Sequence, residues 1–250
     1  MVSNSILITG ASSGIGAALA RAYATRGRHM FLWGRDGARL EAVATAARAH
    51  GAIVETLSFD VTDFAMLIRE LDALDSNNPL DLVFFNAGLG GSLPQDRAGQ
   101  DPHIAEQMAG VNFTAPAIGA NLMAERMAKR GHGHIVLVGS VAAVFPLPMA
   151  PLYSGSKAGL AMFAEALGLR LKRRGVFVTL VSPGFIDTPM SQSLHEPRPF
   201  LITADHAAAI IARKVARHVR HIVIPWQFAM ILAASKFIPR FVVRAVLAAF

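Results

Sequence analysis

The sequence SILITGASSGIG at residues 5–16 decides the fold of this 250-residue chain. It opens with an apolar run of strand type, continues with a glycine turn, and leads into apolar residues at helical spacing. This order of elements directs backbone N–H groups and the positive end of a helix dipole at a pyrophosphate. A glycine-rich turn without a ligand is the alternative. The residues that would hold the pyrophosphate are Gly10, Ser12, Ser13, Gly14, Ile15 and Gly16.

A second motif, YSGSK, stands at residues 153–157 and opens an apolar helical pattern. Tyr153 and Lys157 are four residues apart, so a helix would place both on one face. A free phenol has a pKa of about 10, and a neighbouring positive charge lowers that pKa toward neutrality. The pair therefore predicts a proton donor or acceptor tuned for catalysis. A chance pairing on a helix surface would give the same spacing.

Apolar runs of strand length alternate with stretches of helical period along the chain. The alternation predicts an α/β fold, a doubly wound parallel sheet of Rossmann type, with seven strands and helices on both faces in a single domain. A ligand would bind at the carboxyl ends of the strands, where the motifs fall. We expect strands near 4–9, 29–34, 52–58, 80–85, 134–139, 176–182 and 221–225, and helices near 15–26, 37–49, 63–75, 102–130, 152–173 and 204–219.

The net charge of +7 is confined to the end of the chain. Residues 1–205 carry equal numbers of acidic and basic residues, whereas residues 206–250 hold seven Lys or Arg residues and no acid. The absence of cysteine excludes disulfides and fits a cytoplasmic protein, and no signal peptide is expected. We expect residues 1–225 to form the Rossmann-type domain and residues 226–250 to form an apolar, basic helical extension.

Several further motifs follow the glycine loop in a fixed order. With TGASSGIG at 9–16 they resemble the short-chain dehydrogenases/reductases, and the resemblance covers about residues 3–225. Phe85 departs from the family pattern, because the family often has a second Asn at this position. The departure touches the end of a strand and not the catalytic set. The matching residues are Asn86, Ala87, Gly88, Asn112, Ser140, Tyr153, Lys157, Pro183, Gly184 and Thr188.

The resemblance implies a role for each of these residues. Tyr153 would exchange a proton with the oxygen of a carbonyl or alcohol, and Ser140 would hydrogen-bond the same oxygen. Lys157 would lower the pKa of the tyrosine and contact the nicotinamide ribose. Asn112 would hold a water that links Lys157 to solvent. In the cofactor site, Asp60 and Val61 match positions beside the adenine ring, Asn86, Ala87 and Gly88 match the wall near the ribose, and Pro183, Gly184 and Thr188 match the nicotinamide side.

The end of the second expected strand bears on the choice of cofactor. NAD-binding sites carry an acid there, but this chain has Gly34, followed by Arg35. Because an arginine can bind a phosphate through charge-assisted hydrogen bonds, Arg35 favours NADP(H) over NAD(H). A solvated surface charge is the alternative for Arg35. Asp36 could pair with Arg35, but we expect it to cap the next helix.

Two segments are candidates for the walls of a substrate pocket. Residues 189–203 are expected to form a lid, and residues 145–149 a second apolar wall. Simple loop packing is equally compatible with both. The nine histidines show no metal-ligand spacing, so no metal site is predicted.

The last 25 residues combine aromatic and aliphatic side chains with Lys236, Arg240 and Arg244. Pro239 is expected to divide them into two helices. This composition slightly favours a helix pair lying on an anionic membrane surface, and the alternative is a cover for the substrate pocket or a subunit contact. The spacing is similar to that of bacterial family members acting on lipid-linked sugars, such as the decaprenylphosphoryl-2-keto-ribose reductases.

These observations predict an NADP(H)-dependent oxidoreductase that interconverts a carbonyl and a secondary alcohol, with a lipophilic or lipid-linked substrate. The alternative is a non-catalytic protein that senses NADP(H) and docks on membranes. We expect a homodimer or homotetramer formed through the helices at 102–130 and 152–173. A cytoplasmic location, with peripheral contact at the membrane inner face through residues 226–250, is expected. Nucleic-acid binding is not expected, because the basic tail lacks a stacking face.

Overall fold

The computed structural model describes residues 4–93, 96–145, 147–192 and 197–235. A seven-stranded parallel sheet runs through the molecule in the order β3-β2-β1-β4-β5-β6-β9. Its order reverses between β1 and β4, which makes the carboxyl ends of these strands a natural crevice. The strands are β1 (Ser5–Thr9), β2 (His29–Gly34), β3 (Ile53–Ser58), β4 (Leu82–Phe85), β5 (Gly133–Val138), β6 (Val176–Pro183) and β9 (His221–Ile224).

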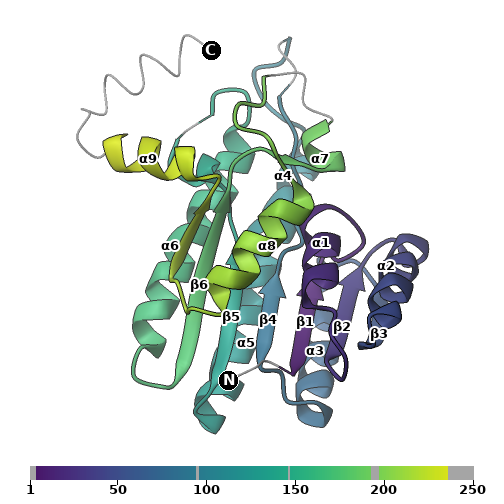
Figure 1. Ribbon diagram of the computed structural model, residues 1–250. Helices are drawn as coiled ribbons and strands as arrows, with labels where there is room; N and C mark the ends of the chain where they lie inside the picture. Colours follow the sequence, from purple (N-terminus) through teal and green to yellow (C-terminus); the bar gives the residue numbers. More distant parts are fainter. Residues whose placement is uncertain (1–3, 94–95, 146, 193–196, 236–250) are drawn as a thin grey trace.

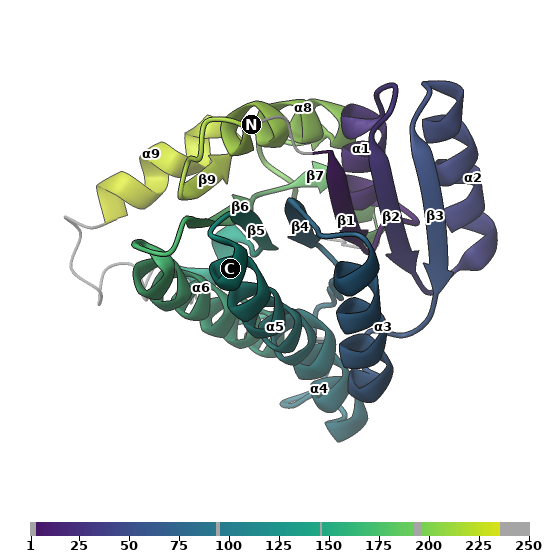
Figure 2. The same ribbon diagram turned by 90° about the horizontal axis from the view of Figure 1, so that it is seen from below.

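Helices cover both faces of the sheet (Figures 1 and 2). One layer contains α1 (Gly14–Tyr23), α2 (Gly37–Ala49) and α8 (Ala204–Val215). The opposite layer contains α3 (Phe64–Asn77), α4 (Pro102–Ala109), α5 (Ala115–Arg130) and α6 (Pro151–Leu171). The doubly wound α/β fold predicted from the sequence is therefore confirmed.

Strand β1 illustrates why the strands are apolar along their whole length. Ile6 and Ile8 pack into the core beneath α1, α2 and α8, whereas Leu7 packs into the core beneath α3, α5 and α6. All three are fully buried. Side chains alternate between the faces of a strand, so a strand covered on both faces needs apolar residues at every position.

The region expected to form one helix over 102–130 is divided into three elements. Between α4 and α5, residues Gly110–Thr114 form the π-helical turn η1. The turn carries Asn112, which is completely buried. A π-turn adds one residue per turn and shifts the side chains that follow it, and such turns often occur at functional sites. The apolar period of the sequence does not reveal this local widening.

A small second sheet was also absent from the prediction. Strands β7 (Ile186–Asp187) and β8 (Ile202–Thr203) pair in parallel and bracket the expected lid, which contains the short helix α7 (Pro189–Gln192). Two-residue strands are too short to produce a periodic signal. The pairing fixes both ends of the lid segment beside the carboxyl edge of the main sheet.

The described part of the C-terminal extension is α9 (Trp226–Ser235), which follows β9 at one edge of the sheet (Figure 1). Pro239, Lys236, Arg240 and Arg244, and with them the expected division into two helices, lie outside the described residues. Within the described residues, every helix is too short or too polar to cross a bilayer.

Candidate active site

A cavity of about 940 Å³ opens at the carboxyl ends of the parallel strands. It extends from the glycine loop after β1 and the loops after β2 and β3 to the lid segment and α9. Of the residues selected from the sequence, all but Gly16 and Asn112 line this cavity. Those two lie behind its wall and position the residues that do line it.

The glycine loop has backbone conformations that require glycine. Gly10 and Gly14 have φ angles of +67° and +54°, in the left-handed region. A Cβ atom on Gly16 would lie 2.2 Å from the carbonyl oxygen of Gly10, so α1 could not begin this close to β1 with any other residue. The loop thus brings the amino end of α1 to the cavity wall, which is the geometry of a phosphate site.

Asn86 fastens the glycine loop to the end of β4. Its Nδ2 donates to the carbonyl oxygens of Thr9, at 3.0 Å, and Gly10, at 3.2 Å. In return, the Thr9 hydroxyl accepts from the backbone N–H groups of Asn86 and Ala87. Asn86, Ala87 and Gly88 line the cavity, but the Asn86 amide also acts as a structural clamp.

At the opposite end of the sheet edge from α9, the cavity wall is charged. Arg35 lies 3.5 Å from Asp60, and both groups are partly exposed. Asp36 caps α2 as expected, by accepting from the backbone N–H of Arg39, and also pairs with the Arg39 side chain at 2.6 Å. Burial favours a higher pKa for Asp60, but hydrogen bonds from Thr62 and the charge of Arg35 together hold that pKa below its ordinary value.

Tyr153 and Ser140 face the cavity from the first turn of α6 and from the end of β5. Ser140 caps the short 3₁₀ turn η2 (Val141–Ala143) by accepting from the N–H of Ala142, at 3.1 Å. The Ser140 hydroxyl donates to the carbonyl oxygen of Pro183, at 3.5 Å. Ser140 and Tyr153 thus line the same cavity, where both hydroxyls are available to a bound carbonyl oxygen.

The electrostatics of Tyr153 differ from those expected for a Tyr–Lys pair. Burial raises the pKa of Tyr153, and the hydrogen bond with Ser140 opposes this rise without cancelling it. The expected lowering of the Tyr153 pKa by Lys157 was therefore wrong, because the pKa lies above its ordinary value. The Lys157 ammonium lies 6.0 Å from the centre of the tyrosine ring and donates to the carbonyl oxygen of Val138 at 3.0 Å. The phenol is consequently protonated at neutral pH.

Lys157 is a buried cation at the floor of the cavity, only 4% exposed. Burial lowers the pKa of its ammonium to about 8. An ammonium has three donors, and Val138 accepts one of them. A Cβ atom on Gly88 would lie 3.5 Å from Nζ and 3.4 Å from Asn112 Oδ1, so the missing side chain at Gly88 keeps this corner open.

Asn112 connects three segments behind the cavity. Its Oδ1 accepts from the N–H of Leu89 at 2.8 Å, and its Nδ2 donates to the carbonyl oxygen of Leu89 at 2.9 Å. The same Nδ2 also donates to the hydroxyl of Ser156, at 3.1 Å. The π-turn therefore ties the loop after β4 to the helix that carries Tyr153 and Lys157.

The far end of the cavity is formed by the loops after β6 and by α9. Thr188 lies against the glycine loop, because its Cγ2 would be 3.0 Å from a Cβ on Gly14. Pro183 ends β6, Gly184 follows it, and the ring of Phe228 lies directly over Gly184. The described part of the extension therefore covers the pocket, which is the second of the two expectations for the tail.

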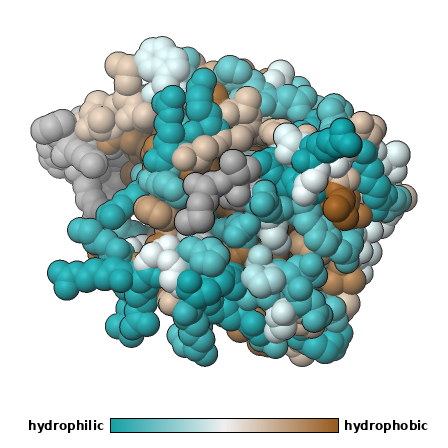
Figure 3. All heavy atoms as spheres, turned by 60° about the horizontal axis from the view of Figure 1, so that its bottom comes forward, coloured by the Kyte–Doolittle hydropathy of each residue, from teal (hydrophilic) through white to brown (hydrophobic). Residues whose placement is uncertain are grey.

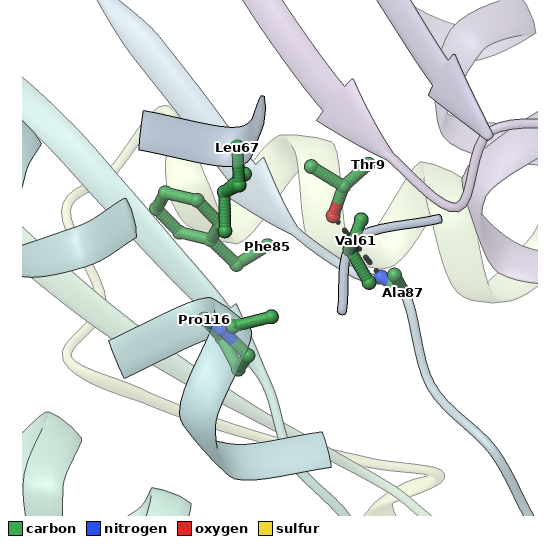
Figure 4. Close-up of a pocket in the computed structure, with 7 residues that line it drawn as sticks. Thr9, Val61, Leu67, Phe85, Ala87 and Pro116 are labelled. Atoms are coloured by element: carbon green, nitrogen blue, oxygen red, sulfur yellow. Dashed lines mark hydrogen bonds between the residues drawn. The ribbon is translucent and has the colours of Figure 1, made fainter. Parts of the chain in front are cut away.

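Phe85, the departure from the family pattern, is buried away from the cavity in the core beneath α3 and α5. Its ring lies over Gly119 of α5, where a Cβ would approach Cε1 to 2.3 Å. Figure 4 shows the ring beside Leu67 and Pro116, around a void of about 10 Å³ that also touches Thr9 and Ala87. The aromatic replacement is thus accommodated by a glycine on the facing helix and leaves the cavity intact.

Several cavity residues were not selected from the sequence. Arg39 stands four residues after Arg35 on the first turn of α2, and a search for a second cation at helical spacing would have found it. Phe228 and Ile231 reach the cavity through long-range packing of α9, for which the sequence gives no local signal. Among the described residues, His, Asp and Glu side chains nowhere gather in threes as a metal site needs.

A doubly wound sheet with a glycine loop at its crevice, and a Ser, Tyr and Lys within that crevice, defines a dinucleotide-dependent oxidoreductase of the short-chain type. The chain belongs to the short chain dehydrogenase family, whose sequence model matches residues 4–199. Members of this family bind a nicotinamide cofactor.

Individual relatives match almost the whole chain. It is 35% identical over 237 residues to an uncharacterized oxidoreductase of Myxococcus xanthus, covering 93% of this chain and 92% of the relative. A short-chain dehydrogenase from Sphingobium yanoikuyae, solved in complex with NADPH, superposes with a TM-score of 0.83 at 28% identity and 93% coverage of both chains. The bulky-bulky ketone specific alcohol dehydrogenase from Comamonas testosteroni superposes with a TM-score of 0.80 at 25% identity, covering 93% of this chain and 92% of the other.

Proposed function

We propose that this protein is an NADP(H)-dependent reductase of neutral, apolar ketones, or a dehydrogenase of the corresponding secondary alcohols. The observation that carries the proposal is that Ser140, Tyr153 and Lys157 share one cavity with the glycine loop. In the reaction, a hydride would pass between the nicotinamide and a carbonyl carbon held beside it in this cavity.

The residues present fit a nicotinamide dinucleotide. Gly10, Gly14 and Gly16 permit the tight loop at the amino end of α1, where backbone N–H groups favour a pyrophosphate. Lys157 has N–H donors left for a ribose hydroxyl, and Thr188 lies beside the loop for the nicotinamide side. Asp60 and Val61 line the part of the cavity assigned to the adenine.

When bound, the dinucleotide supplies or accepts the hydride, and the protein handles the proton and the developing charge. The Ser140 hydroxyl hydrogen-bonds the carbonyl oxygen and holds it next to the Tyr153 hydroxyl. As negative charge grows on that oxygen, Tyr153 gives it a proton. The raised pKa of Tyr153 keeps this proton in place until it is needed. Lys157 adds a positive charge to the same low-dielectric corner, and Asn112 holds the loop and helix around it.

Removal of the Ser140 hydroxyl tests this arrangement. Ser140→Ala is expected to lower kcat for ketone reduction by about 10²-fold or more, the cost of one donor to a developing oxyanion. The dissociation constant for NADPH should stay within about threefold of wild type, because Ser140 is not placed at the nucleotide end. Steady-state assays of NADPH oxidation measure kcat, and fluorescence titration with NADPH measures the dissociation constant. If Ser140→Ala has the kcat of wild type, Ser140 is not the proposed hydrogen-bond donor.

The preference for NADP(H) is supported by the cations at the nucleotide end. Arg35 and Arg39 both line the cavity, and no acid stands at Gly34. We expect Arg35→Ser to weaken NADPH binding by about tenfold, the loss of one charge-assisted bond, and to leave NADH binding nearly unchanged. Equal weakening of both cofactors would argue against a phosphate contact.

The subunit and membrane contacts of the protein are part of the same proposal. We place a homodimer or homotetramer contact on α4, α5 and α6, where Met162 and Leu169 are exposed apolar residues. For the tail, an anionic membrane surface is supported by the exposed side chains of Trp226 and Met230 together with the cations at 236, 240 and 244. Flotation of the full chain and of a variant lacking residues 226–250, with anionic and with neutral vesicles, tests the membrane contact. A DNA-binding assay of the same two proteins tests the alternative of nucleic-acid binding.

The second candidate function is a sensor that binds NADP(H) without turnover. Only the cavity and its nucleotide end are needed for such a protein. The presence of Ser140, Tyr153 and Lys157 in the lining of one cavity favours the enzyme instead. A protein that binds NADPH but consumes none with a panel of alkyl and aryl ketones would be the sensor.

A further inference from the structure

The cavity has a charged end and an apolar end, which lie at opposite sides of the sheet edge. Its charged lining residues Arg35, Asp36, Arg39 and Asp60 follow β2 and β3, whereas β6 and β9 lead into the other end. Among the described lining residues, Lys157 is the only charged side chain on the β5–β9 side. That side is lined instead by Phe145, Leu147, Met149, Phe185, Phe228 and Ile231.

Phe228 occupies a central place at this apolar end. It is the buried residue of α9, and its ring lies over Gly184, where a Cβ would approach Cε2 to 2.3 Å. Gly184 is itself held by its N–H donating to the carbonyl oxygen of Ile224, at 2.7 Å. Only a glycine at 184 lets the phenyl ring sit directly on the backbone that follows β6, beside the nicotinamide side of the cavity.

The Phe228 ring is also the centre of an aromatic cluster. It lies 6.2 Å from the ring of Phe185 and 5.7 Å, edge to face, from the ring of Phe200 at the end of the lid segment. Phe200 has a φ angle of +58°, a left-handed conformation that is rare for a bulky residue. Strained residues of this kind persist where the surrounding contacts over-determine them, and they cluster at ligand sites. Phe200 is 46% exposed and is not a lining residue of the cavity, so its ring contacts Phe228 from outside the lining.

We propose that Phe185 and Phe228, which both line the cavity, form a binding subsite for an aromatic or branched apolar substituent of the ketone, and that Phe228 determines this specificity. The inference rests on the proposed function and names the substrate class of the same site. Aromatic rings bind a phenyl group by edge-to-face and offset contacts. Among the described lining residues at this end, Lys157 is the only cation that a carboxylate or phosphate could meet, so we expect anionic ketones to be poor substrates.

Two ketones that share an ethyl group but carry either a phenyl or a methyl group on the other side of the carbonyl test the subsite. Phe228→Ala should lower kcat/KM for propiophenone by about tenfold or more, the usual effect of removing an apolar contact from a pocket. The kcat/KM for 2-butanone, which has a methyl group in place of the phenyl group, should stay within about threefold of wild type. Phe228→Leu should recover part of the propiophenone activity.

Trp226→Ala is the matched control, because Trp226 is on the same helix but is 65% exposed and does not line the cavity. It should leave the ratio of the two kcat/KM values unchanged. Thermal unfolding of each variant separates a local loss of specificity from general destabilisation of α9. The proposal fails if Phe228→Ala lowers kcat/KM for both ketones by the same factor. It also fails if Trp226→Ala changes the ratio of the two kcat/KM values as much as Phe228→Ala does.

A binding measurement separates this inference from the proposed function. Calorimetric titration of propiophenone into the protein with NADP⁺ should show binding to wild type and about tenfold weaker binding to Phe228→Ala. Wild-type binding that depends on Phe228, without any turnover, would refute the reductase and keep the subsite. Equal binding by both proteins, or no binding by wild type, would refute the subsite.

Discussion

At the scale of single residues, the candidate site contains a lysine, Lys157, whose positive charge is unfavourable because the side chain is buried. Lys157 is almost completely inaccessible, and its ammonium makes a hydrogen bond to the Val138 carbonyl but no ion pair with any described residue. The low pKa of about 8 measures how unfavourable this charge is in the folded protein. Lys157 therefore costs stability, which is typical of groups retained for catalysis.

This cost predicts a pH-dependent gain from its removal. Lys157→Met should raise the free energy of unfolding at pH 7 by about 2 kcal/mol, the desolvation cost less the lost hydrogen bond. In the folded state Lys157 loses its proton near pH 8, whereas in the unfolded state it keeps it until about 10.4. The free energy of unfolding of wild type should therefore rise relative to that of Lys157→Met between pH 8 and pH 10. The difference in free energy of unfolding between the two proteins should become smaller over this range.

Urea unfolding at a series of pH values measures this gap. Lys129→Met is the control, because the Lys129 side chain is 73% exposed and its removal should give no such narrowing. A gap between wild type and Lys157→Met that widens above pH 8 would contradict the burial argument.

Asn112 gives a second prediction at this scale. Asn112→Ala should lower the free energy of unfolding by about 2–4 kcal/mol, because it leaves the N–H and the carbonyl of Leu89 without their partner. Asn121→Ala, on the exposed side of α5, should cost less than about 1 kcal/mol. Denaturant unfolding of the two variants, compared side by side, checks the difference. Similar small losses would mean that water replaces the Asn112 amide.

At the scale of elements, the structure shows how a residue outside the family pattern is accommodated. Phe85 ends β4 with a ring that only a glycine at 119 of α5 can accept. The contact joins the sheet to the helix that follows the π-turn η1. The strand end and the helix have thus adapted to each other behind the cavity.

This fit predicts that Gly119→Ala is destabilising by about 1–3 kcal/mol, although alanine is the better helix former. The added methyl group would overlap the Phe85 ring. Combining it with Phe85→Leu should restore part of the loss. Gly155→Ala on α6 is the control, because a Cβ there meets nothing within 4 Å, and it should stabilise by up to about 1 kcal/mol. Thermal unfolding of the four proteins provides the test, and a neutral Gly119→Ala would contradict the proposed overlap.

Some elements could be predicted from the sequence, and others could not. β1, the glycine loop and α1 were predictable because their signals are local and consecutive. The π-turn at Asn112 was not, because its apolar spacing is continuous with that of α4 and α5 on either side. The raised pKa of Tyr153 was missed for a related reason: the spacing from Lys157 shows proximity along a helix, but burial is set by distant segments. Phe228 was missed because its contacts with Gly184 and Phe200 join segments far apart in the chain.

At the scale of the whole molecule, polar and apolar surfaces are distributed unevenly. The face seen in Figure 3, which brings the lower end of Figure 1 forward, is largely hydrophilic. By contrast, the lining residue Met190 and two residues of the expected lid, Phe200 and Leu201, are exposed apolar side chains. An apolar rim of this kind suits a substrate that leaves water when it enters the cavity.

The proposed subunit contact is tested at this scale. Met162 and Leu169 are 68% and 63% exposed and lie on one face of α6, seven residues apart. We expect wild type to sediment as a dimer or tetramer, and the double variant Met162→Glu/Leu169→Glu to sediment as a monomer, because the buried charges would be unpaired. Ile68→Glu on α3 should leave the assembly intact. A monomeric wild type would exclude the contact.

The central claim is that the Tyr153 hydroxyl delivers the proton in a reaction that consumes NADPH. The measurement that tests it most directly is the single-turnover rate of NADPH oxidation with propiophenone, for wild type and for Tyr153→Phe. The account predicts that the substitution lowers this rate by about 10²-fold or more, while NADPH binding stays within about threefold of wild type. Equal rates for the two proteins would contradict it.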